Sequence, residues 1–170
     1  MKRIALAFCT LFIALSGFSQ NDIISSFFDK FAGAEGITTV NITGDMLKLM
    51  AQAEMERRDT VIKSTLSEIR ILSAEDESDI PDGFNLKAEI IDKLDKSVYK
   101  EMIRVNQTDE DVLVLVRESN GRIQELLVVV GGDDENALSQ IKGDMLLSEL
   151  ADMAGRYQMK GFEHLKKMNR

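Results

Sequence analysis

The chain has 170 residues and a formal net charge of −8 at pH 7, with one cysteine, one histidine, two tyrosines and no tryptophan. This composition excludes a disulfide scaffold and a thiolate metal site, and the acidic charge argues against general nucleic-acid binding. The length suits one domain that buries its own apolar core.

The N-terminal segment 1–19 has the pattern of a secretory signal peptide. Two basic residues precede an almost wholly apolar run over residues 4–15, and small residues then lead to an expected cleavage after Ser19 or Gln20. The apolar run is shorter than the roughly 20 residues that span a bilayer. Cys9 lies inside this run and is expected to leave with it. The mature chain is therefore predicted to be periplasmic or secreted, without a transmembrane span.

The remaining pattern predicts one α+β domain over residues 20–154, with a mixed, mostly antiparallel sheet, a C-terminal β-meander and packed helices. Helices are predicted where apolar residues recur three and four positions apart, and strands where β-branched residues alternate or run together. In chain order we expect a helix over 21–33, a strand over 37–43, a helix over 44–58, a short helical piece over 61–68, a strand over 70–74, a helix over 82–97, strands over 98–105, 112–118, 123–131 and 137–142, and a last helix over 145–154.

Methionine and leucine side chains dominate the apolar positions of the helix over 44–58. They are expected to face inward as adaptable core filler. The residues concerned are Met46, Leu47, Met50 and Met55.

The strongest local signal is the stretch 111–132, two aliphatic runs on either side of Asn120-Gly121. This dipeptide favours a type I′ turn, so the stretch predicts a β-hairpin, which we expect in the middle of the sheet. Alternate side chains of a strand point to opposite faces, and both faces of these strands are aliphatic. Either both faces are covered, or one of them is a surface for a partner.

Residues for catalysis are scarce. His164, the only histidine, lies in a polar tail, and no serine occupies a strand-to-helix elbow. The acidic residues that follow Gly131-Gly132 would repel a phosphate, so this pair is no phosphate-binding loop. The sequence therefore predicts no catalytic residues and no cofactor, and it favours a protein that is not an enzyme.

Two acidic turns are expected to emerge at the same end of the sheet. Asp109 and Asp111 belong to the turn before the hairpin, and Asp133 and Asp134 to the turn after it. Such oxygen ligands could bind calcium, although no EF-hand pattern is present, and acidic turns are more often simply solvated. These four residues are the candidate metal ligands.

The segment 155–170 is a basic tail in an otherwise acidic chain. Its five Lys and Arg residues against one Glu give a charge of +4. The tail is either a frayed terminus or a segment that contacts the acidic body or an anionic membrane surface.

Four segments of the chain form a familiar pattern: EGITTVNITGDMLKLM over 35–50, EIRILSAED over 68–76, YKEMIRVNQTDEDVLVLVRE over 99–118 and IQELLVVVGGDDENALSQIKGDM over 123–145. Together they resemble the Bacteroidota domain-of-unknown-function family 4252. The resemblance implies a small exported single-domain protein with a signal peptide, but no established activity and no functional residues. Some members carry a lipoprotein cysteine, which this chain lacks at the expected place.

The sequence favours a non-catalytic, exported, envelope-associated interaction or accessory protein. It is expected to bind an unknown protein partner or to self-associate through an apolar sheet face. The alternative is a carboxylate-based hydrolase or a calcium-binding module that acts at the acidic end of the sheet.

Overall fold

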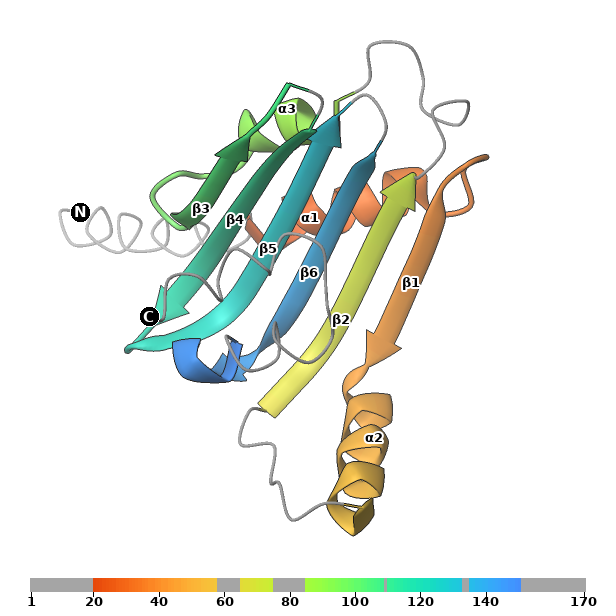
Figure 1. Ribbon diagram of the computed structural model, residues 1–170, viewed down its shortest axis with the longest axis vertical. Helices are drawn as coiled ribbons and strands as arrows, with labels where there is room; N and C mark the ends of the chain where they lie inside the picture. Colours follow the sequence, from red (N-terminus) through yellow and green to blue (C-terminus); the bar gives the residue numbers. More distant parts are fainter. Residues whose placement is uncertain (1–19, 58–64, 75–84, 109, 133–134, 151–170) are drawn as a thin grey trace, which may run out of the picture.

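The computed structural model describes residues 20–57, 65–74, 85–108, 110–132 and 135–150 (Figure 1). Their six strands form one sheet in the order β1-β2-β6-β5-β4-β3, and each neighbouring pair is antiparallel. The predicted α+β class is confirmed, and β3 to β6 form the meander. The elements are α1 (Gln20–Phe31), β1 (Thr38–Thr43), α2 (Gly44–Arg57), β2 (Thr65–Ala74), α3 (Leu86–Ile91), β3 (Lys100–Asn106), β4 (Glu110–Ser119), β5 (Arg122–Gly132) and β6 (Asn136–Met145).

The predicted hairpin is present as β4 and β5. Asn120 and Gly121 have φ angles of 54° and 74°, the positive values that a type I′ turn requires. The hairpin is not the central pair of the sheet, however, because the two middle strands are β5 and β6. The predicted weak strand at β6 runs for ten residues and is paired on both sides, with β2 and with β5.

One face of the sheet is covered by α1 and α3, which lie behind it in Figure 1. Helix α1 contributes three nearly fully buried side chains, Ile24, Phe27 and Phe28, each worth about 1.5–3 kcal/mol of burial. They pack with leucine and valine side chains from four strands and with the apolar side of α3. The strand members of this core are Leu72, Leu113, Leu115, Leu127, Val129 and Leu138.

The opposite face of the hairpin is buried as well. Val112, Val114 and Val116 are at most 3% exposed, and Leu126, Val128 and Val130 are equally buried. Leu150, in the helical residues 147–150 that follow β6, belongs to the same apolar cluster. Of the two arrangements that the sequence allowed, the structure therefore has the one with both aliphatic faces buried.

The predicted helical piece over 61–68 is wrong in its second half. Residues 61–64 lie outside the described residues, but Thr65 already begins β2, which pairs with β1 on one side and β6 on the other. Ser67 is an extra residue in the pairing between β2 and β6. Its insertion shifts the alternation of apolar side chains, which made this part of the strand resemble a helix.

Two predicted helices have different bounds in the structure. Helix α3 ends at Ile91, and Asp95 then accepts a hydrogen bond from the Ser97 backbone N–H at 2.7 Å, which stabilises a turn in place of further helix. The last helix does not begin at Met145, because β6 continues there in register with Ile123 of β5.

Helix α2 differs most from its predicted environment. It continues β1 beyond the end of the sheet (Figure 1), and among the described elements its main contacts are with β2 and β1. Met46 and Met50, expected to face inward, are 51% and 44% exposed, and Leu49 is 61% exposed. Leu47 is half-buried, and the side chain of Met55 lies outside the described residues. The helix itself was predicted correctly, but none of the described elements covers its apolar side.

Candidate functional site

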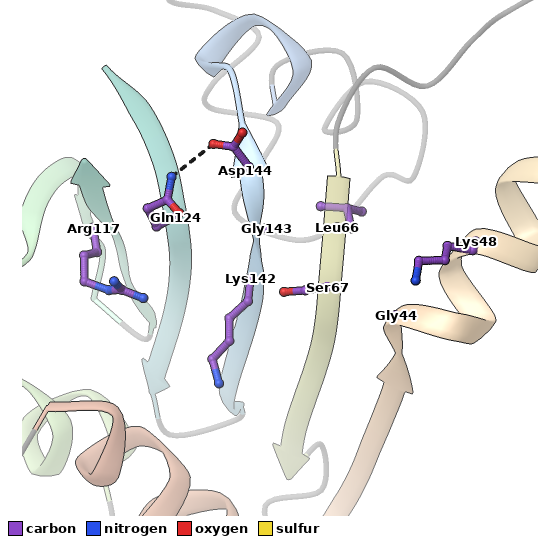
Figure 2. Close-up of a pocket in the computed structure, with 9 residues that line it drawn as sticks. All are labelled: Gly44, Lys48, Leu66, Ser67, Arg117, Gln124, Lys142, Gly143 and Asp144. Carbon is purple, nitrogen blue, oxygen red and sulfur yellow. Dashed lines mark hydrogen bonds between the residues drawn. The ribbon is translucent and has the colours of Figure 1, made fainter. Parts of the chain in front are cut away.

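A concavity lies where α2 begins beside β2 and the last residues of β6. It encloses about 570 Å³ and is wide open to solvent. Figure 2 shows Lys48 extending from α2 toward β2, and Lys142 and Arg117 on the strands beyond. This is the end of the sheet that holds the Asn120-Gly121 turn, opposite the end at which β4 begins and β5 ends. The lining residues are Gly44, Lys48, Leu66, Ser67, Arg117, Gln124, Lys142, Gly143 and Asp144.

Each cation in this lining has a carboxylate partner. Lys142 donates to Glu68 at 3.0 Å, Arg117 to Glu125 at 3.0 Å, and Lys48 to Asp45 at 3.5 Å. Their positive charges are therefore balanced within the protein, and the pocket offers little net charge to attract an anionic ligand.

Asp144 is the single carboxylate in the lining. It accepts hydrogen bonds from Arg122 Nε at 2.6 Å and Gln124 Nε2 at 3.1 Å. The hydrogen bond from Arg122, and a smaller contribution from Gln124, hold the pKa of Asp144 below its ordinary value. A carboxyl group that stays ionised is a poor general acid, and the pair of carboxyls that a glycoside hydrolase uses is not found in this lining.

A row of polar side chains is buried under α1, next to the pocket. Its centre is Glu125, which is 1% exposed and accepts hydrogen bonds from Tyr99 Oη at 3.0 Å, from Arg117 Nε and from Gln140 Nε2. The row continues from Gln140, whose Oε1 accepts from Arg70 Nε at 2.8 Å. A buried carboxylate is tolerated here because it is surrounded by donors from β4 and β6 and by Tyr99, which directly precedes β3.

Arg70 connects this row to α1. Its Nη2 donates to Ser25 Oγ at 3.1 Å, and its guanidinium lies over the Phe28 ring, 4.3 Å from the ring centroid. The row therefore joins four strands and a helix by directional contacts. The sequence analysis missed it, although an ionisable residue such as Glu125 inside an aliphatic strand is a signal that could have indicated it.

Tyr99 is the group in this row with a strongly shifted pKa. Burial is the main cause, and the charge and hydrogen bond of Glu125 add to it, so that the pKa of Tyr99 lies far above its ordinary value of 10.0. The phenol therefore keeps its proton at any physiological pH and serves as a hydrogen-bond donor. A phenol held in this way does not act as a base, so the row fits a structural role.

The acidic end of the sheet is partly neutralised by α3. Asp111, one of the four candidate metal ligands, forms a 2.6 Å ion pair with Lys87 Nζ, and Asn106 accepts from the same ammonium at 3.4 Å. Lys87 is 7% exposed, so Asp111 is its balancing charge. Asp109, Asp133 and Asp134 lie outside the described residues, and calcium binding by these turns stays a prediction.

Other sequence-based candidates cannot be placed. His164, the basic tail and the segment 1–19 all lie outside the described residues. Within the part of the chain that is described, no three His, Cys, Asp or Glu side chains gather in a metal-binding arrangement. None of the helices described there is long and apolar enough to cross a bilayer.

The fold and the site together define the class of this protein. It is a single α+β domain with an antiparallel six-stranded sheet, a buried row of polar side chains and an open, charge-balanced pocket. Comparison with protein families matches residues 30–153 to the Domain of unknown function (DUF4252) family, and the chain belongs to it. The resemblance read from the four sequence segments is thereby confirmed. No curated protein and no solved structure matches the chain.

Proposed function

We propose that the protein is a non-catalytic, exported, envelope-associated accessory protein that binds another protein through the apolar side of α2. The observation that carries this proposal is the exposure of Leu49, Met46 and Met50, which are 61%, 51% and 44% exposed. Met46, Leu49 and Met50 stand at positions i, i+3 and i+4, so they share one side of the helix. A soluble domain rarely leaves such a group of large apolar side chains in water unless a partner covers it.

The chemistry of this surface indicates the kind of partner. Methionine side chains are flexible and polarizable, and they adapt to differently shaped apolar grooves. A helix with apolar residues at this spacing fits a groove in another protein, as amphipathic recognition helices do. The partner is therefore a protein with an apolar groove rather than a small polar ligand.

A pull-down from an envelope fraction tests the binding surface. The bait is the protein itself, compared with the double variant Leu49→Gln/Met50→Gln and with the control Leu147→Gln, which alters an apolar side chain of similar exposure, 50%, after β6. We expect a partner that the wild type and the control retain and the α2 variant loses. Retention of the same proteins by all three baits contradicts the proposal, as does retention of none.

Export is a separate part of the proposal, supported by the signal-peptide pattern over residues 1–19. N-terminal sequencing of the protein from cells is expected to begin at Gln20 or Asn21, with the protein in the periplasmic or secreted fraction. Recovery of the unprocessed chain from the cytoplasm contradicts export while leaving the binding surface open to its own test.

A further inference from the structure

The two edge strands of the sheet are protected to different degrees. Strand β3 carries Lys100, Glu101 and Arg104, and Lys100 forms a 2.9 Å ion pair with Glu118 of β4. Met102 is an extra residue in its pairing with β4, which makes a β-bulge. Charges and bulges are the usual means by which natural edge strands avoid pairing with another chain.

Strand β1, at the other edge, has none of this protection. Its sequence TTVNIT holds no charge and no proline, and its register with β2 is uninterrupted over all six residues. Five of the six residues are exposed, Val40 among them at 39%. Within the described residues β1 pairs with β2 alone, so the outward backbone groups are available for a further strand.

We propose that β1 is a dimerisation edge: two copies of this chain pair their β1 strands antiparallel about a two-fold axis, which gives one continuous sheet. The proposal is independent of the partner-binding function assigned to α2.

Charge favours a second copy of the chain as the occupant. The chain as a whole is acidic, so two copies repel each other over most of their surfaces. The neutral strand β1 is a place where they can approach without opposing carboxylates. In sequence, the charged side chains nearest to β1 are Glu35 before it and Asp45 after it, and Asp45 forms an ion pair with Lys48 at 3.5 Å.

The residue types of β1 also suit pairing with an identical strand. With the two-fold axis at Val40, this side chain lies opposite its own counterpart and Thr38 lies opposite Ile42 of the other copy. Such pairs of β-branched side chains across two strands stabilise a sheet. The protected edge at β3 then explains why association stops at two copies. Because the pairing uses the one unprotected edge among the described strands, it closes as a dimer and does not continue as a filament.

Light scattering on the purified protein over a micromolar to sub-millimolar series tests the proposal. The wild type is expected to dimerise, and Val40→Lys to raise the dimer dissociation constant at least about tenfold, because two lysines then face each other across the axis. Gln107→Lys, an equal charge change at an exposed position outside the strands, is the control and is expected to dimerise as the wild type does.

A charge exchange makes the test specific for two-fold pairing at Val40. Val40→Lys and Val40→Glu are each expected to dimerise at least about tenfold more weakly than the wild type, and to form a mixed dimer when combined. Circular dichroism checks that each variant is folded, and Thr39→Lys replaces Val40→Lys if that variant is not.

A wild type that stays monomeric over the whole series overturns the proposal. Val40→Lys that dimerises as tightly as the wild type does the same, and so do weakened variants that fail to combine. A monomer that instead adds a strand from another protein at β1 also overturns it.

Discussion

The helix-covered face of the sheet and the corner formed by β1 and α2 are built from similar residues, but they differ in what surrounds them. Under α1, aliphatic side chains are almost completely buried, and each side chain of the row around Glu125 has a hydrogen-bond partner. In the β1–α2 corner, leucine, methionine and valine side chains are 39–61% exposed, and one strand edge is unpaired among the described residues. The first region therefore holds the buried contacts that stabilise the fold, and both proposed binding surfaces lie in the second.

The largest expected effect comes from the buried carboxylate. Glu125→Ala leaves Arg117 and the Tyr99 hydroxyl without their partner and removes a charge that is 1% exposed, and it is expected to cost about 3–5 kcal/mol in urea unfolding. Glu118→Ala is the matched control, because it removes a carboxylate of the exposed ion pair with Lys100 and should cost less than about 1 kcal/mol. Equal losses for the two variants would falsify the structural role of the row.

A smaller effect is expected at Gly131, where α3 approaches the sheet. A Cβ at this position would lie 2.5 Å from Asn85 Oδ1 and 2.8 Å from Lys87 Cβ. Gly131→Ala must therefore displace the start of α3, where Asn85 caps the helix and Lys87 pairs with Asp111, at a cost of about 1–3 kcal/mol. Calorimetric melting checks this; an unchanged melting temperature contradicts so tight a contact.

Tyr99 makes the covered face sensitive to alkaline pH. Because the pKa of folded Tyr99 is raised above the ordinary value of 10.0, the unfolded chain loses this proton first. The stabilisation is fully present below pH 10 and is lost as pH rises further toward the folded-state pKa. Tyr99→Phe is expected to cost about 0.5–1.5 kcal/mol at pH 8 and to weaken the decline above pH 10. Parallel declines in the two proteins contradict the raised pKa.

The smallest change in stability is expected in the exposed corner. Leu49→Ala should alter the free energy of unfolding by no more than about 0.5 kcal/mol. The same substitution at Leu127, which is fully buried, should cost about 2–5 kcal/mol. A large loss at Leu49 would show that α2 is packed in solution, which would remove the basis for its role as a binding surface.

Much of the strand and turn pattern could be predicted from the sequence. The Asn120-Gly121 turn depends only on the positive φ angles that these two residues accept. The aliphatic runs on either side of it are typical of buried strands, and they form β4 and β5. The candidate site was mostly not predicted. Of the candidate metal ligands, Asp111 is placed, in a pair with Lys87, and the polar row was missed because its members are far apart in the chain. Arg70 and Gln140, for example, are separated by 70 residues.

The sequence by itself determined the α+β class, the family and the hairpin, because periodicity and turn conformation are local properties. Only the tertiary structure decided that β6 lies in the middle of the sheet and that 65–68 is strand. It likewise decided that the apolar side of α2 faces solvent. These outcomes depend on which strands lie side by side and where the sheet ends, since burial is a property of the assembled neighbours rather than of the residue. The exposed edge at β1 and the uncovered side of α2 follow from that arrangement.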